Sequence, residues 1–110
     1  MGKDYSSEVK ELIKKYKKED IAYGKRLDLL LSRIGATQEE VENEILNCET
    51  LRFAEKQEKD GEARYALFFI YSNKRGRIYL ITFRDRSLRV ITIIPLGRLS
   101  VRRYLKRRFI

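Results

Sequence analysis

Cationic side chains gather in the last third of this chain, and the chemistry they offer is phosphate binding. Residues 74–110 hold 12 lysines and arginines against one acid, Asp85, whereas residues 1–73 hold 13 basic and 15 acidic side chains. Most of these cations are arginines, whose planar fork donates paired hydrogen bonds to phosphate oxygens. Such a local concentration indicates a nucleic acid or an acidic protein as partner. The alternative is the charge-rich surface of a heat-adapted protein.

The terminal segment 98–110 is strongly cationic and has the spacing of an amphipathic helix. Val101, Leu105 and Phe109 fall at four-residue steps on one stripe, with Tyr104 at its edge. The cations on the other side are expected to contact phosphates or an acidic partner, and they are Arg102, Arg103, Lys106 and Arg107. Tyr104 is either a site residue or a tyrosine that caps the core.

The chain has no histidine and one cysteine, Cys48, which limits its chemistry. Zinc, copper and haem have no ligand set, so no metal and no other cofactor is expected. The Ser–His and Cys–His pairs of most nucleophilic hydrolases are excluded too. Cleavage of RNA through its 2′-hydroxyl needs a proton acceptor, cations around the phosphorus and a proton donor for the leaving oxygen. Tyrosine or lysine with a shifted pKa would have to move these protons, because arginine stays charged.

Residues 1–48 are predicted to be helical. Apolar side chains recur at helical spacing over residues 9–16 and again over 23–34. The two stripes are nearly in phase, so the pattern allows one long helix or two helices with a corner at Asp20. The capping box TQEE at residues 37–40 opens a further helix.

The hydrophobic period changes over residues 50–94, which predicts a sheet. One strand is expected from Leu51, and three more at residues 64–72, 77–83 and 88–94. The short turns between them leave no room for crossover helices, so the sheet should be an antiparallel meander. Because the middle strands are apolar on both faces, segment 98–110 is expected to cover part of the second face. The predicted class is therefore α+β in one domain, with N-terminal helices on a four-stranded antiparallel sheet and a short basic C-terminal helix.

No membrane span and no secretion signal is expected. The longest apolar run, residues 66–71, is far shorter than the roughly 18 to 20 residues that cross a bilayer. The N-terminus is charged and lacks the apolar stretch of a secretion signal. The lone Cys48 agrees with a reducing compartment, so we expect a cytoplasmic protein.

The stretch RIYLITFRDRSLRVITIIPLGRLSVRRY, residues 77–104, resembles the C-terminal half of RelE-type toxins. These toxins are ribosome-associated mRNA endonucleases of toxin–antitoxin pairs. In that family an arginine opens a central strand, a second follows the last strand and a tyrosine comes soon after; Arg77, Arg98 and Tyr104 stand at these positions. The resemblance implies that both arginines hold the scissile phosphate and that Tyr104 stacks on a base or helps proton transfer. It also implies a compact toxin fold, no metal and a small acidic antitoxin as partner.

The chain also departs from the family pattern. RelE-type toxins usually begin with a strand, and many carry lysines on the strand before the first arginine as candidate bases. Here that strand has only Arg64, so Lys74 and Arg75 of the next turn would substitute, and Arg84 is expected to join them in RNA binding. BrnT-like toxins share the VIT strand and the basic segment after it. The related ParE toxins act on gyrase without cutting RNA, so the alternative is a non-catalytic nucleic-acid-binding or gyrase-directed protein.

Overall fold

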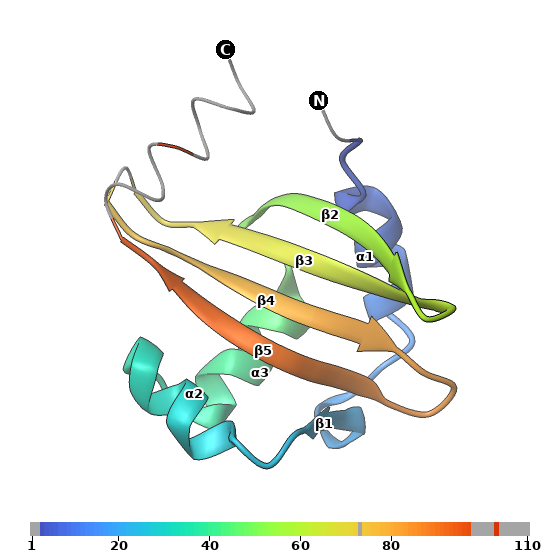
Figure 1. Cartoon of the computed structure of the whole chain (residues 1–110), viewed down its shortest axis with the longest axis horizontal. Coiled ribbons are helices and arrows are strands. Elements are labelled where there is room, and N and C mark those ends of the chain that lie inside the picture. The colour runs from blue at the N-terminus through green and yellow to red at the C-terminus, as the bar shows by residue number, and fades with distance from the viewer. Residues whose placement is uncertain (1–2, 73, 98–102, 104–110) are drawn as a thin grey trace.

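The computed structural model describes residues 3–72, 74–97 and 103, which form an α+β fold. Its elements, in chain order, are α1 (Ser6–Ile13), the 3-10 helix η1 (Lys18–Asp20), β1 (Ile21–Tyr23), α2 (Leu27–Ile34), α3 (Gln38–Asn47), β2 (Leu51–Lys59), β3 (Glu62–Ile70), β4 (Gly76–Phe83) and β5 (Leu88–Leu96). The α-helices pack on one face of a single sheet (Figure 1).

The sheet has five strands in the order β1-β5-β4-β3-β2. Strands β2 to β5 form the expected antiparallel meander. The short β1 is the addition, and it runs parallel to β5 with Ile21 paired to Leu88. The prediction of a four-stranded antiparallel sheet was therefore wrong by one strand, and the sheet is mixed. The sequence did not indicate β1 because its three residues are too few to show the alternation of apolar and polar side chains that is typical of a strand. Tyr23 also fits the helical stripe that follows it.

The helix ends follow local chemistry. The Thr37 hydroxyl accepts a hydrogen bond of 3.2 Å from the backbone N–H of Glu40, as the predicted cap requires. Helix α2 ends at Gly35, whose φ of 64° is left-handed, and α3 ends at Cys48 with a φ of 56°. Glycine takes that conformation without strain, which is why the chain turns sharply between the two helices at Gly35.

The main core lies between the helices and the sheet. Buried residues from the three α-helices are Val9, Ile13, Leu30, Val41 and Ile45. They pack on alternate residues of the strands, such as Tyr65, Leu67 and Phe69 of β3. A bulge near the start of β2 shifts the register between Leu51 and Phe53, so Phe53 turns to the opposite face.

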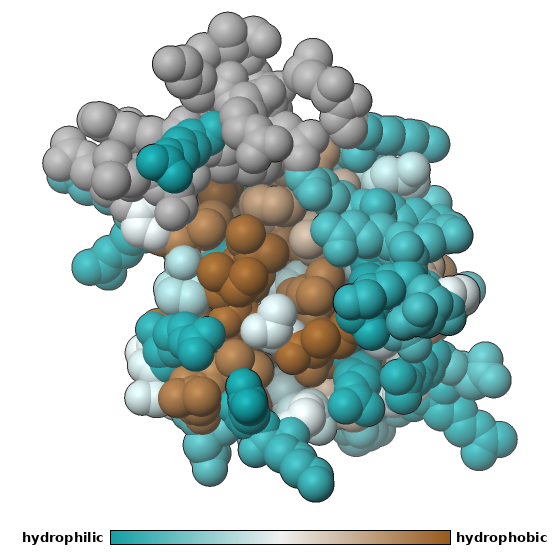
Figure 2. All heavy atoms as spheres, viewed as in Figure 1, coloured by the Kyte–Doolittle hydropathy of each residue, from teal (hydrophilic) through white to brown (hydrophobic). Residues whose placement is uncertain are grey.

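The face of the sheet away from the helices, here called the outer face, is also apolar. Figure 2 shows brown side chains gathered at its centre. The cluster consists of Phe53, Ala66 and Phe68, with Ile70, Ile78, Leu80 and Leu96 packed against them. Ile94 is 43% exposed. No helix among residues 3–72 and 74–97 lies over this face (Figure 1). The expected basic helix at 98–110 falls outside the described part of the chain, apart from Arg103.

The described helices are all short. None of them has the length and apolar character needed to cross a bilayer.

Candidate functional site

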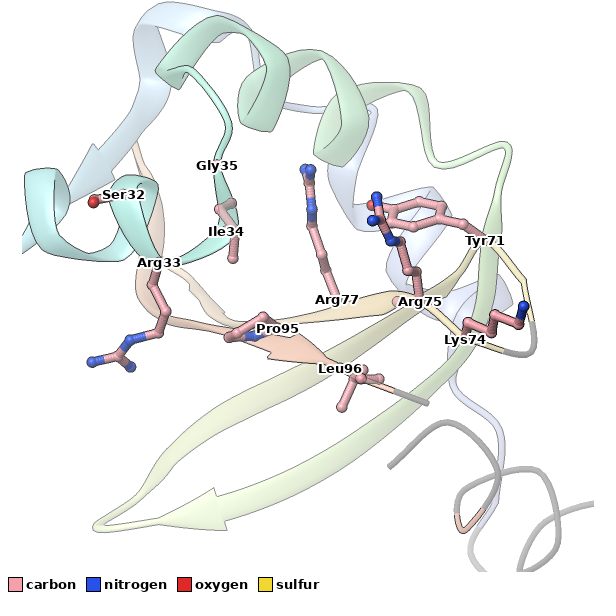
Figure 3. A pocket seen from close by; sticks show the side chains of 12 residues that line it. Ser32, Arg33, Ile34, Gly35, Tyr71, Lys74, Arg75, Arg77, Pro95 and Leu96 are labelled. Carbon is pink, nitrogen blue, oxygen red and sulfur yellow. The ribbon is translucent and has the colours of Figure 1, made fainter. Parts of the chain in front are cut away.

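A pocket of about 660 Å³ opens at one end of the sheet. Its walls come from the end of α2, the turn between β3 and β4, and the end of β5. Four cationic side chains line it, and they are Arg33, Lys74, Arg75 and Arg77. Tyr71 stands near Arg75 and Lys74, on the side of the pocket away from Arg33 (Figure 3). We call this site the basic pocket.

The turn that carries two of the cations is held by its own backbone. The N–H groups of Tyr71 and Ser72 both donate to the carbonyl of Arg75, at 3.0 and 3.3 Å. The Lys74 N–H donates to the Ser72 hydroxyl at 3.1 Å. Gly76 then lets β4 begin close to β3, since a Cβ there would meet the Phe69 carbonyl at 2.8 Å. The turn therefore fixes the starting points of the Lys74 and Arg75 side chains at the mouth of the pocket.

Arg77 is oriented by a carboxylate from helix α3. Its Nη1 lies 3.5 Å from Oε1 of Glu44 and donates to the Tyr79 hydroxyl at 3.3 Å. Glu44 also accepts hydrogen bonds from the hydroxyls of Tyr71 and Tyr79. The side chains of Arg77 and Glu44 are only 21% and 15% exposed. Glu44 lies in the last turn of α3, where the helix dipole disfavours an anion, so its donors compensate for an unfavourable position.

The side chains of the pocket wall point in different directions. Arg75 and Arg77 extend from the sheet toward the helices, whereas Arg33 directs its guanidinium away from them (Figure 3). The Arg77 guanidinium also lies over the Tyr71 ring, with 5.6 Å between Cζ and the ring centroid. Arg75 and Arg77 can therefore approach one anion together, while Arg33 adds positive potential from the opposite rim.

The phenols near the pocket, those of Tyr71 and Tyr79, donate hydrogen bonds to Glu44. Burial and the hydrogen bonds to Glu44 raise the pKa values of Tyr71 and Tyr79 far above the ordinary range of tyrosine. Burial also raises the pKa of the Cys48 thiol to about 11, so this thiol is protonated at neutral pH. The described residues around the pocket thus favour anion binding over proton transfer through these phenols.

The pocket unites three of the residues predicted from the sequence, namely Lys74, Arg75 and Arg77. Arg84 lies at the other end of β4, roughly 23 Å from Arg77 at about 3.3 Å per residue. There its guanidinium is 3.4 Å from Glu62, and its carbonyl accepts a hydrogen bond from the Tyr16 hydroxyl. Arg103 is exposed. The remaining predicted residues lie outside the described part of the chain, and they are Arg98, Arg102, Tyr104, Lys106 and Arg107.

Sequence patterns did not single out Arg33 or Glu44, and they favoured a core position over a base-stacking role for Tyr71, whose side chain is 44% exposed. Glu44 follows Val41 by three residues, and this spacing could have placed it on the inward side of α3. Tyr71 directly follows the last residue of β3 and precedes the turn residues. Arg33 carries no such signal, because its place depends on how α2 packs on β5.

The chemistry of the site is that of anion binding by cations and hydrogen-bond donors. Among residues 3–72, 74–97 and 103, no three His, Cys, Asp or Glu side chains gather in a way that could hold a metal ion. Searches of protein-family models, of curated proteins and of solved structures found no match to this chain.

Proposed function

We propose that this protein is a RelE-like toxin that binds RNA through the basic pocket and cleaves mRNA without a metal ion. The observation that carries the proposal is that Lys74, Arg75 and Arg77 line one pocket of about 660 Å³. Cations gathered in a concave site raise the local positive potential, which attracts a phosphate backbone. The RelE-like pattern of residues 77–104 adds the expected family and chemistry.

The charges of the pocket suit a singly charged phosphodiester. The four cations outnumber Glu44, their acidic neighbour, so a net positive potential remains. A guanidinium has five N–H donors, so Arg77 can keep Glu44 on Nη1 and offer other N–H groups to a phosphate. Glu44 would then orient Arg77 for the ligand, and it would also lower the net positive charge of the pocket.

The proposed setting follows from the same chemistry. The protein acts in the cytoplasm on mRNA at the ribosome, where single-stranded segments are accessible. A small acidic antitoxin neutralises the toxin by covering its cations, including those of segment 98–110. No metal or other cofactor takes part in the proposed reaction.

The double variant Lys74→Ala/Arg75→Ala tests the pocket. We expect weaker binding of single-stranded RNA, and a slope of log affinity against log salt that is shallower by about 1.4, at about 0.7 per lost phosphate contact. The matched control is Lys59→Ala/Arg86→Ala, which removes the same charge from exposed positions at the opposite end of the sheet. Fluorescence anisotropy over a salt series measures both quantities. Equal losses in the two double variants would show that RNA does not bind at the pocket.

The second candidate function is RNA or gyrase binding without catalysis. It is favoured by the raised pKa values of Tyr71 and Tyr79, which leave these phenols unsuited to accept a proton. The variant Arg98→Ala separates the two functions. In a nuclease it should abolish mRNA cleavage and growth arrest with only a small loss of RNA affinity.

Induced expression with mapping of mRNA ends measures this difference. New ends that appear with the parent protein and vanish with Arg98→Ala support the nuclease. Growth arrest with unchanged transcripts would contradict it and favour the gyrase-directed alternative.

A further inference from the structure

Tyr71 is an exposed aromatic residue on the wall of the basic pocket. Its side chain is 44% exposed, whereas Phe69, two residues earlier near the end of β3, is buried. Lys74 and Arg75 lie next to it on the same wall (Figure 3). An exposed aromatic ring among cations is the usual composition of a site that binds single-stranded nucleic acid.

The Tyr71 ring is also held in place. Its hydroxyl donates to Glu44, and its backbone N–H donates to the Arg75 carbonyl at 3.0 Å. The Arg77 guanidinium lies over one face of the ring, 5.6 Å from the centroid. The hydroxyl end is therefore anchored, while 44% of the residue stays exposed. A ring that is already ordered loses little conformational entropy when a ligand stacks on it.

We infer that Tyr71 is a stacking platform for a nucleobase, so the basic pocket takes a nucleotide unit of single-stranded RNA. The base lies on the Tyr71 ring and its phosphate lies against Lys74 and Arg75. This inference rests on the proposed RNA-binding function and names the form of RNA that the site takes. The pocket volume of about 660 Å³ lies within the range of roughly 300 to 1,000 Å³ that is usual for small-ligand sites.

The platform makes the site selective for unpaired RNA. A base inside a duplex is already stacked on its neighbours, so its face is not available to the ring. Phosphate contacts alone do not make this distinction, because both strands of a duplex present them. Tyr71 therefore adds selectivity for single strands to the affinity that the cations supply.

Two oligomers of equal length test the inference. One is a short oligouridylate, and the other is an abasic ribose-phosphate oligomer that keeps the charges and lacks the bases. We expect the unaltered protein to bind oligouridylate about tenfold or more tightly than the abasic oligomer. We also expect the ring-proton NMR signals of Tyr71 to shift upfield with oligouridylate alone.

Two variants locate the effect. Tyr71→Leu should lower the affinity for oligouridylate about tenfold, with no change for the abasic oligomer or in the salt slope. Tyr71→Phe keeps the ring and should retain most of the affinity. If Tyr71→Phe is as weak as Tyr71→Leu, the hydroxyl matters and the ring does not, which overturns the inference.

The outcomes with the unaltered protein separate the two proposals. Equal affinity for both oligomers overturns the stacking platform and leaves RNA binding intact. Absence of binding to either oligomer contradicts the proposed function itself. Both results are independent of whether Tyr71→Leu folds.

Discussion

Arg77→Ala should weaken RNA binding more than tenfold and also destabilise the protein by about 1–3 kcal/mol. Arg77 is a cation of the pocket that is held in place through its Nη1 and the carboxylate of Glu44. Its removal leaves Glu44, only 15% exposed, without that positive charge. Breaking a fully buried ion pair costs about 3–5 kcal/mol. The loss should be smaller here because Tyr71 and Tyr79 still donate to Glu44.

Glu44→Gln should act in the opposite direction on RNA. The amide oxygen can still accept from one of the two phenols, its NH2 group faces the hydroxyl oxygen of the other, and the negative charge that competes with phosphate for Arg77 is gone. We expect tighter RNA binding and a small loss of stability. In the double variant, Glu44→Gln should restore part of the stability lost in Arg77→Ala without restoring RNA binding.

Urea unfolding and RNA titration of the unaltered protein, the two single variants and the double variant complete this double-mutant cycle. Additive effects on stability would contradict a direct interaction between Arg77 and Glu44. Weaker RNA binding by Glu44→Gln would mean that Glu44 acts mainly by orienting Arg77, and that its charge does not oppose the ligand.

Phe69→Ala should lower the free energy of unfolding by about 3–5 kcal/mol, which is more than the loss expected for Arg77→Ala. Phe69 is fully buried in the main core, and its ring meets the Tyr79 ring edge to face at a centroid distance of 5.4 Å. A cavity at this position removes the support of Tyr79, which is one of the donors to Glu44. The total stability of a small domain is about 5–15 kcal/mol, so this single change removes a large part of it.

The exposed Ile94 supplies the control. Ile94→Ala removes apolar atoms from a side chain that is 43% exposed and should cost far less. The free energy of unfolding in urea measures both variants. Similar losses in the free energy of unfolding at the two positions would contradict the conclusion that the stability depends on the packing of Phe69 in the core.

The strands of the meander were predictable because residues typical of turns mark where the strands begin and end in the sequence. Strands β3 and β4 are apolar stretches closed by turns, β2 ends in the turn before β3, and Asp60 and Gly61 of that turn both adopt a positive φ. Strand β5 continues through Pro95 to Leu96, two residues beyond the end of the strand expected at residues 88–94. The reason is that β1 pairs only with Leu88–Val90. Beyond Val90 that side of β5 is an edge of the sheet, where a residue without a backbone N–H breaks no hydrogen bond between strands.

The site was predictable only where its residues are close in the sequence. Lys74 and Arg75 belong to one turn and Arg77 follows at the start of β4, and their cationic character alone suggests a shared role. Glu44 and Arg33 join them through the packing of α2 and α3, which no local pattern encodes. Arg84 was grouped with the turn by charge, but the length of β4 separates the two ends of the strand.

The pairing of β1 with β5 has a consequence for the order of folding during synthesis. Ile21 finds its partner only at Leu88, so this contact must wait until most of the chain has left the ribosome. Helices α1 and α2 have eight residues each, and helices this short are not stable alone in water. The basic pocket also needs walls from α2, the turn before β4 and the end of β5. A nascent chain therefore acquires the site late, once its last strand has been made.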